Sequence, residues 1–234
     1  MAQTPPAPTL DVVIPALDAA THIEATLEAL AEGRRGGLVR DVLVADGGSR
    51  DDTVARARRA GARVIAGPRG RGPQLKAGAA ASAADWLLFL HADTRLAPGW
   101  SGAVAAFIGA AAGSDRAAVF TLAFDDPSVH ARALARLANW RARRLGLAYG
   151  DQGLVLSRGF YDRLGGFRPL PLMEDVDLVR RIGRARLAHL DARAVTSAER
   201  YRRSGWWPRA ARNLAVLALY YLGVPARLLK RFYG

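Results

Sequence analysis

The chain has 234 residues and half of them are apolar, so it is long enough to bury one sizeable core. It has no cysteine, which excludes disulfides, zinc–thiolate sites and a thiol nucleophile. The formal net charge is +13, and most of the excess lies in residues 181–234, which carry twelve basic and two acidic side chains. Such a segment attracts phosphate groups, nucleic acid or an anionic membrane. A general abundance of arginine is the alternative explanation.

Strands and helices are expected to alternate over the first ninety residues. The apolar run Trp86–Leu90 predicts a strand that is buried on both faces. A capping box at Thr21–Glu24 opens the first helix, Asp51 or Asp52 caps the second, and Pro73 suits the first turn of the third. This alternation is typical of a parallel α/β sheet with helices on both faces. The expected strands are 10–15, 39–45, 62–66 and 86–90, and the expected helices are 21–32, 53–60 and 73–83.

The second half of the chain predicts a less regular arrangement. The apolar segment Leu214–Val224 is too short to span a bilayer, which takes about twenty residues. It can pack as a helix that closes the domain, or it can lie in a membrane interface. The expected helices are 100–112, 130–145, 174–181 and 209–222, and the expected strands are 117–124 and 153–157, with weaker candidates at 187–190 and 194–196.

One main domain is expected, over residues 10–205. Residues 1–9 are rich in proline and alanine and lack the pattern of a signal peptide, so we expect a disordered tail there. Residues 206–234 are expected to form a basic helical appendage, packed on the domain or on a membrane surface.

Acidic side chains follow the predicted strands or open a predicted helix. Asp46 follows the second strand, Asp93 follows the strand at 86–90, and Glu174 and Asp175 open a helix. Ligands of open α/β sheets bind where the strands end at their carboxyl edge. A carboxylate at that edge can hold a divalent cation, which in turn binds phosphate oxygens. The structural alternative is that Asp93 caps a turn and that the paired acids only complement the helix dipole.

The loop 67–76 is rich in glycine and basic residues and opens a predicted helix. Its backbone N–H groups, together with Arg69, Arg71 and Lys76, suit a phosphate group. It is no Walker loop, because the Gly-Lys-Ser/Thr pattern is absent.

Taken together, these segments resemble glycosyltransferase family 2. Val12–Ala19 resembles the family's first-strand motif, with Asp18-Ala19 where Asn-Glu is common. Leu90–Asp93 matches its Asp-x-Asp site, with His91 replacing the first aspartate. Val44–Thr53 resembles the family motif Asp-Asp-Gly-Ser-x-Asp-x-Thr, and Met173–Asp175 matches a Glu-Asp motif. Gly67–Lys76 resembles a further family segment, with Lys76 where asparagine is frequent. Arg200–Trp206 is a loose counterpart of the motif Gln-x-x-Arg-Trp.

The resemblance implies a Rossmann-like GT-A fold, with a mostly parallel sheet flanked by helices, and it implies roles for individual residues. Asp175 would be the catalytic base with Glu174 beside it, and Asp93 with His91 would hold Mg²⁺ or Mn²⁺. We expect Asp151 and Gln152 to line the acceptor side. The implied nucleotide-sugar contacts are Pro15, Asp46, Arg69, Arg71, Lys76, Ala92 and Asp93, and weaker diphosphate contacts are Arg202, Arg203 and Trp206.

The expected function is metal-assisted transfer of a sugar from a nucleotide-diphosphate sugar to an acceptor hydroxyl. A single base without a second nucleophilic carboxylate favours inversion at the anomeric carbon. The acceptor is expected to be a small or lipid-linked molecule, and no nucleic acid is expected as a partner. The expected location is the cytoplasm, with peripheral attachment to the inner face of the membrane as an option.

Within the family, the chain most resembles a bacterial subgroup that is associated with arsenosugar-type biosynthesis. The residues that carry this resemblance are His91-Ala92-Asp93-Thr94 and Gly150-Asp151-Gln152-Gly153. Two other functions stay open. A sugar nucleotidyltransferase would share the fold, although no glycine-rich loop follows the first strand, and a non-enzymatic binder of nucleic acid or membranes would use the basic tail.

Overall fold

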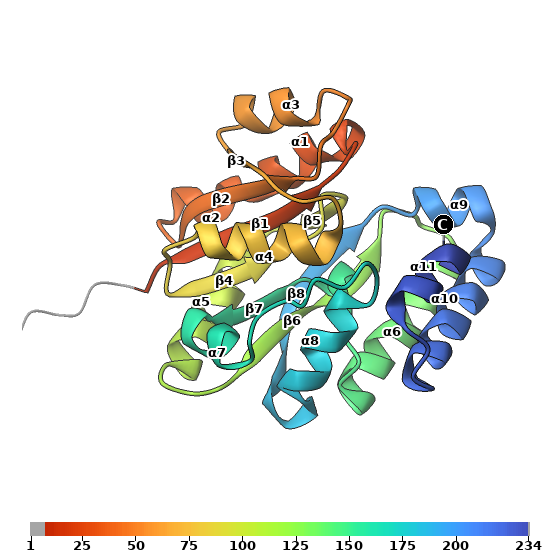
Figure 1. Cartoon of the computed structure of the whole chain (residues 1–234). Coiled ribbons are helices and arrows are strands. Elements are labelled where there is room, and N and C mark those ends of the chain that lie inside the picture. Colours follow the sequence, from red (N-terminus) through yellow and green to blue (C-terminus); the bar gives the residue numbers. More distant parts are fainter. Residues whose placement is uncertain (1–7, 234) are drawn as a thin grey trace, which may run out of the picture.

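A mixed eight-stranded sheet runs through the computed structural model, which describes residues 8–233 (Figure 1). The strand order is β3-β2-β1-β4-β7-β6-β8-β5. The first four strands are mutually parallel, β7 is antiparallel to both of its neighbours, β8 is parallel to β6, and β5 is antiparallel to β8. The strands are β1 (Leu10–Ala16), β2 (Val39–Asp46), β3 (Arg63–Ala66), β4 (Trp86–Phe89), β5 (Thr94–Leu96), β6 (Ala117–Phe124), β7 (Leu154–Ser157) and β8 (Leu187–Thr196).

Helices cover both faces of this sheet, and two apolar clusters fill the layers between them. On β1, Val12 and its alternate residues pack toward α1 and α5, whereas Val13 packs toward α4 in a cluster that also includes residues of α7 and α8. The helices are α1 (Ala20–Ala29), α2 (Ala31–Arg35), α3 (Thr53–Arg59), α4 (Arg71–Ala81), α5 (Trp100–Ala111), α6 (Val129–Leu145), α7 (Arg158–Arg163), α8 (Glu174–Ile182), α9 (Glu199–Ser204), α10 (Trp206–Tyr221) and α11 (Ala226–Tyr233), with short 3₁₀ turns at 150–152 and 184–186.

Most predicted elements are confirmed, and three expectations need correction. The capping box is wrong, because α1 begins at Ala20 without a side-chain cap of its own. Instead, Thr53 and Asp51 from the next connection accept hydrogen bonds from the backbone N–H groups of Ala19 (2.7 Å) and Ala20 (3.0 Å). The two weak strand candidates are one continuous strand, β8, and the short strand β5 has no apolar run long enough to predict it.

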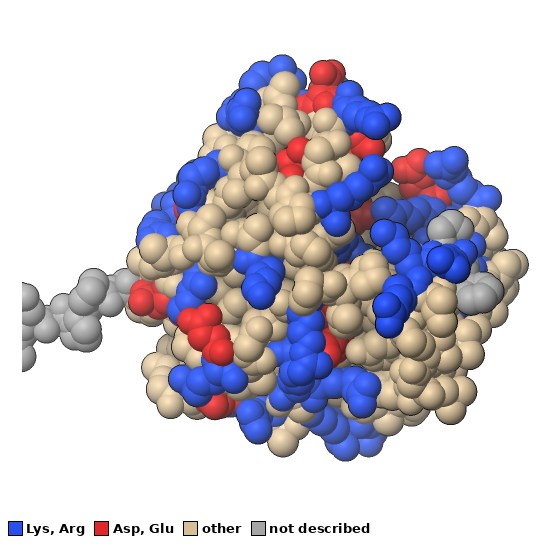
Figure 2. Space-filling model, in the orientation of Figure 1, with Lys and Arg blue, Asp and Glu red and all other residues tan. Residues whose placement is uncertain are grey.

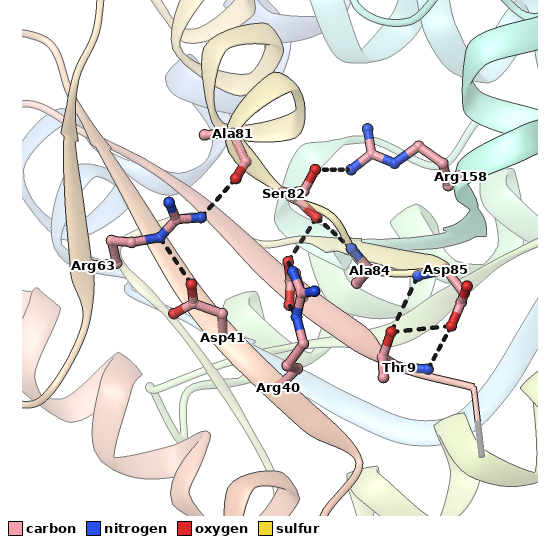
Figure 3. Close-up of polar contacts among 10 residues, drawn as sticks. Thr9, Arg40, Asp41, Arg63, Ala81, Ser82, Ala84, Asp85 and Arg158 are labelled. Carbon is pink, nitrogen blue, oxygen red and sulfur yellow. Dashed lines mark hydrogen bonds and ion pairs between the residues drawn. The ribbon is translucent and has the colours of Figure 1, made fainter. Parts of the chain in front are cut away.

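Ion pairs and hydrogen bonds bind together the amino-terminal end of the parallel strands (Figure 3). Asp11 is fully buried and accepts hydrogen bonds from the Arg40 guanidinium at 2.5 and 3.0 Å and from the Ser82 hydroxyl at 2.7 Å. Asp85 accepts hydrogen bonds from the N–H and hydroxyl of Thr9, both at 3.0 Å. Every carboxylate in this group therefore has a partner that offsets the cost of removing it from water.

The C-terminal helices α10 and α11 lie against the start of α8, on the right in Figure 1. Val216 and Leu217 of α10 and Leu229 of α11 form a buried cluster with Met173 and Val176. Residues 1–7 of the predicted tail lie outside the described residues, so the structure describes only Pro8 and Thr9 of it.

Candidate functional site

The turn after β4 is held through its backbone, which leaves its side chains free. The carbonyl of Ala92 accepts a hydrogen bond from the Thr26 hydroxyl at 2.8 Å, and the carbonyl of Asp93 accepts one from the N–H of Ser197 at 3.0 Å. Among residues 8–231, whose side chains the structure describes, no group donates a hydrogen bond to the Asp93 carboxylate or forms an ion pair with it. A partly buried carboxylate without a partner is costly to keep, so it marks a place where a ligand can supply the missing contact.

Asp175, at the start of α8, lies next to His91 across the backbone of Gly150. Its Oδ2 accepts a hydrogen bond from the N–H of Gly150 at 2.8 Å, and its Oδ1 accepts one from the N–H of Val176 at 2.8 Å. A Cβ atom on Gly150 would stand 2.3 Å from His91 Nε2 and 3.2 Å from Asp175 Oδ2. Glycine at position 150 is therefore what allows the imidazole and the carboxylate to approach each other.

Charged or titratable side chains from three segments act on one another at this place, which we call the central cluster: His91 and Asp93 from the turn after β4, Asp151 from the turn at 150–152, and Asp175 from α8. Burial lowers the pKa of His91 to about 4, with a further decrease from Arg71 and opposing increases from Asp93 and Asp175. Burial raises the pKa of Asp151 to about 6, and the charges of Asp175 and Asp93 raise it further, against Arg141. His91 is thus uncharged at neutral pH, and Asp151 takes up a proton more readily than an aspartate in water.

The interior beneath the central cluster is nearly closed. A cavity of about 20 Å³ lies between β4, α4 and α8, with His91 and Asp175 in its wall. That is room for about one water molecule. The cavity is therefore too small for a substrate, which has to bind outside it.

Glu174 and Arg71 connect the start of α8 to the start of α4. Glu174 is fully buried, and one of its carboxylate oxygens lies 2.8 Å from Arg71 Nε. Burial raises the pKa of Glu174 to about 7, and Arg71 opposes this increase. Gly72 packs so closely here that a Cβ atom would stand 2.7 Å from the carbonyl oxygen of Arg168. Glu174 is therefore held by an ion pair within the protein.

Asp46 lies at the same edge of the sheet, two strands away from β4. Its carboxylate accepts hydrogen bonds from the N–H groups of Gly48 (3.0 Å) and Ser49 (3.1 Å) and from the Ser49 hydroxyl. These bonds fix the loop after β2. Strands are spaced about 4.8 Å apart, so Asp46 and the central cluster are separated by roughly 10 Å, and no contact links them.

The other residues expected to bind the nucleotide sugar are spread along this edge. Pro15 is buried in β1, while Arg69 and Lys76 are exposed on the loop and first turns of α4. The amide of Gln74 is buried and donates hydrogen bonds to the carbonyls of Ala16 (2.6 Å) and Ala45 (2.8 Å). Gln74 was not among the expected site residues, although it lies in the segment 67–76 that resembles a family motif.

The two residues expected on the acceptor side differ in what they can reach. The amide of Gln152 faces inward, donating to the carbonyl of Phe120 at 3.1 Å and lying 3.3 Å from Asn139 Oδ1. Asp151 belongs to the central cluster, and its buried Oδ1 has no hydrogen-bond partner in the described part of the chain. The buried hydroxyl of neighbouring Tyr149 also lacks one, and the Arg141 guanidinium lies 4.0 Å over its ring. Tyr149 and Arg141 were not expected at the site.

The basic residues of α9 divide into two groups. Arg202 pairs with Asp126 at 3.2 Å and with Asp125 at 3.5 Å, and Arg203 lies 3.8 Å from Glu199. Trp206 stacks on Tyr201 with ring centres 5.2 Å apart. The charge of Arg200, by contrast, lowers the pKa of His91 and therefore acts at the central cluster. Sequence reasoning selected Arg202 and Arg203 and missed Arg200.

The possible metal ligands at the central cluster suit a hard divalent cation that also binds water and substrate oxygens. Among residues 8–233, no three acidic or imidazole side chains are grouped closely enough to enclose a metal ion by themselves. Asp93 offers a free carboxylate and His91 an uncharged ring nitrogen. Because Mg²⁺ keeps several waters and binds substrate phosphates, one or two protein ligands are enough for it.

Comparison with known proteins identifies the relatives of this chain. The sequence model described as Glycosyl transferase family 2 matches residues 11–153, which is more than half of the chain. No curated protein sequence matches it. The fold is similar to that of glucosyl-3-phosphoglycerate synthase from Mycobacterium tuberculosis in complex with Mn²⁺, uridine diphosphate and glucosyl-3-phosphoglycerate, at 23% identity and a TM-score of 0.54, over 81% of this chain and 70% of that one.

A second structure of that synthase, in complex with Mn²⁺, uridine-diphosphate-glucose and glycerol 3-phosphate, is 26% identical with a TM-score of 0.52. The match covers 78% of this chain and 69% of the synthase. The arrangement of the sheet and helices is thus the GT-A fold that the sequence motifs implied. The chain belongs to glycosyltransferase family 2 and is a glycosyltransferase.

Proposed function

We propose that this enzyme transfers a sugar from a nucleoside-diphosphate sugar to an acceptor hydroxyl, with inversion at the anomeric carbon. The observation that carries the proposal is the unpartnered carboxylate of Asp93 in one cluster with Asp175, since the charges of both act on His91. The position of Asp175 is fixed by the N–H of Gly150 at 2.8 Å. One carboxylate is free to bind a cation, and the other is oriented to accept a proton. Family membership favours this reaction over the nucleotidyltransferase and over the non-enzymatic binder.

Asp93, with His91 beside it, would hold Mg²⁺ or Mn²⁺. When bound, the cation supplies positive charge that stabilises the diphosphate leaving group. The synthase structures contain Mn²⁺ with uridine nucleotides, which supports this assignment. Arg200, whose charge acts on His91, is placed to support the same phosphates, and we assign it this role ahead of Arg202, Arg203 and Trp206, whose side chains already have partners.

Asp175 would act as the general base, and Glu174 would position it through the contact with Arg71. Each oxygen of the Asp175 carboxylate accepts one hydrogen bond from a backbone N–H group, which holds the side chain in place. A fixed carboxylate suits a base that must lie within hydrogen-bond reach of the acceptor hydroxyl. Asp151 and Gln152 would line the acceptor side. Further along the edge, Pro15, Asp46, Arg69, Lys76 and Ala92 would contact the donor.

A thermal-shift panel of nucleoside diphosphates, each with and without Mn²⁺, tests this function. A ligand that binds the folded state raises its stability by mass action, about 2.7 kcal/mol at a hundred times its Kd. We expect one nucleoside diphosphate to raise the melting temperature more in the presence of Mn²⁺ than in its absence. No shift with any nucleotide would contradict the proposal, and product with retained anomeric configuration by NMR would contradict inversion.

We also propose that the enzyme belongs with the subgroup associated with arsenosugar-type biosynthesis. The two segments that carry this resemblance, 91–94 and 150–153, meet in space at the contact between His91 and Gly150. A shared local geometry gives a reason for the two segments to occur together. Activity toward an arsenic-containing acceptor, measured beside its arsenic-free analogue, tests the assignment.

Peripheral attachment to an anionic membrane is a further proposal; it would give the enzyme access to a lipid-linked acceptor, as the alternative to a small-molecule one. In the described part of the chain, all ten strongly exposed large apolar side chains lie in α6, α10, α11 or the turn between the last two, among them Trp140, Trp207 and Leu222. None of these three helices contains an acidic residue, and together they hold ten arginines and lysines. Over α10 and α11 the surface consists of basic side chains and of side chains without charge, which are blue and tan in Figure 2.

Apolar and aromatic side chains among arginines are typical of helices that lie in the headgroup region. No helix among the described residues is long and apolar enough to cross a bilayer. We expect the protein to sediment with vesicles containing phosphatidylglycerol and not with pure phosphatidylcholine. Trp207→Ser combined with Leu222→Ser should release it, whereas Arg58→Ser on α3 should not. Equal recovery with both kinds of vesicle would contradict the proposal.

A further inference from the structure

A second hollow, which we call the α6 groove, lies between α6 and the carboxyl-terminal half of β6. Its volume is about 450 Å³, within the range of roughly 300–1,000 Å³ that is usual for small-molecule sites. Three arginines line it: Arg132 and Arg136 from α6, and Arg193 from β8. Arg132 and Arg136 are four residues apart and therefore share one side of the helix.

The positive charge of the α6 groove is not neutralised by the protein. In residues 8–231, whose side chains the structure describes, no group forms a hydrogen bond or an ion pair with the guanidinium of Arg136 or Arg193. Arg132 donates only to the uncharged carbonyl of Pro127. Asp126, which also lines the groove, already binds Arg202 at 3.2 Å and the N–H of Ser128 at 2.9 Å. The three exposed arginines of the groove therefore keep guanidinium N–H groups that can bind an added anion.

The α6 groove adjoins the central cluster through a short chain of hydrogen bonds. The N–H of Ser197 donates to the carbonyl of Asp93 at 3.0 Å, and the N–H of the next residue, Ala198, donates to Asp125 at 2.7 Å. Asp125 directly precedes the groove residue Asp126. On the inner side, the groove residue Asn139 lies 3.3 Å from the Gln152 amide. A molecule that reached from the groove to the central cluster would pass along this boundary.

We infer that the α6 groove binds a phosphate or carboxylate group of a small molecule. Guanidinium groups pair bidentately with both kinds of anion and remain charged at any working pH. Resting on the proposed function, this molecule is the acceptor: its anion lies in the groove and its hydroxyl reaches Asp175. The acceptor is then an anionic, phosphorylated or carboxylated, hydroxyl compound.

Isothermal titration calorimetry without nucleotide or metal tests the groove independently of sugar transfer. The probes are glycerol 3-phosphate, inorganic phosphate and uncharged glycerol. We expect saturable binding of glycerol 3-phosphate and none of glycerol. Arg136→Ser with Arg193→Ser should weaken binding roughly tenfold or more per guanidinium, as for other charge-assisted hydrogen bonds. Arg116→Ser, at the opposite end of β6, should leave binding unchanged, and circular dichroism confirms that each variant is folded.

The possible results distinguish anion binding in the α6 groove from the proposed sugar transfer. Absence of saturable binding with both anions, or equal binding by the double variant, would overturn the anion site. Inorganic phosphate binding as tightly as glycerol 3-phosphate would uphold the site and overturn its assignment to the acceptor. Failure of the nucleotide panel with anion binding intact would overturn the proposed donor and leave the groove assignment standing.

Discussion

The two ends of the parallel strands treat acidic side chains in opposite ways. At the amino-terminal end, buried Asp11 accepts three hydrogen bonds from Arg40 and Ser82 (Figure 3). At the carboxyl end, the Asp93 carboxylate has no partner in the described residues, and Asp175 is bonded only by backbone N–H groups. Because an unpaired charge costs stability, the unpaired acids have to be justified by what binds to them.

The difference teaches that charge pairing distinguishes the two ends of this sheet. The amino-terminal end, where the acids have partners within the protein, is called the folding end below. Both ends contain partly or fully buried carboxylates, so burial alone does not separate them. What separates them is whether the protein itself supplies the counter-charge. The comparison predicts that variants at the amino-terminal end change stability, whereas variants at the central cluster change rate or ligand binding.

Asp175→Asn should have the largest effect on transfer. Asparagine keeps the side-chain oxygen that accepts from the N–H of Gly150, but it cannot take a proton, so the rate should fall by about 10²–10⁴-fold with nucleotide affinity nearly unchanged. Single-turnover transfer and nucleotide binding by calorimetry measure the two quantities separately. Weakened nucleotide binding with an intact rate would show that the base has been misassigned.

Asp93→Asn should abolish the metal-dependent part of donor binding. The loss of a charge that positions the cation should lower the rate by about a hundredfold or more, as expected when transition-state charge stabilisation is removed. Melting curves with the nucleotide, with and without Mn²⁺, give the metal-dependent shift directly. Asp191→Asn, at an exposed site on β8, is the control and should keep it. An unchanged turnover in Asp93→Asn would rule out the metal role.

Arg40→Met tests the amino-terminal end of the parallel strands, where stability should change. It leaves the buried Asp11 carboxylate without its ion pair, and breaking a buried pair costs about 3–5 kcal/mol, here toward the lower value because Arg40 is partly exposed and Ser82 remains. Urea denaturation measures the loss. Arg56→Met breaks an exposed pair with Glu24 and should cost less than about 1 kcal/mol. If Arg40→Met altered nucleotide affinity as well, the division between the two ends would fail.

The sequence was sufficient for elements whose cause is local. Apolar runs predicted six of the eight strands, β1 to β4, β6 and β7, and Asp93 was selected because it follows the most apolar of these runs. The direction of β7 was not predictable, because pairing with β4 and β6 depends on residues far away in the chain. Local pattern also explains why β5, three residues long, was missed.

The candidate site was predictable only where one segment carries the chemistry. His91 and Gly150 are far apart in sequence, and only the fold brings the imidazole to the place that a Cβ at position 150 would occupy. Choosing Arg200 over Arg202 depends on which guanidinium already has an acidic partner, a property that spacing does not contain. For Asp46, the motif was recognised in the sequence, but its hydrogen bonds to Ser49 are visible only in three dimensions.

Glu174 belongs to neither side of the comparison and gives the smallest predicted effect. It is buried and paired like Asp11, yet it adjoins Asp175, the proposed base. Burial raises its pKa from 4.5 to about 7 in the folded state. Between these values the unfolded chain loses the proton while the folded chain keeps it, so folding stability should decrease as the pH rises through this window, by at most about 3 kcal/mol.

Glu174→Gln removes the titrating group and should flatten this part of the stability curve. Urea denaturation at pH 5 and pH 8 measures the difference, with Glu28→Gln at an exposed position of α1 as the matched control, which should follow the wild type. Parallel curves for the wild type and Glu174→Gln would mean that Arg71 fully compensates the buried carboxylate. Glu174 would then belong with the paired acids of the folding end, and the boundary between the two ends would lie between residues 174 and 175.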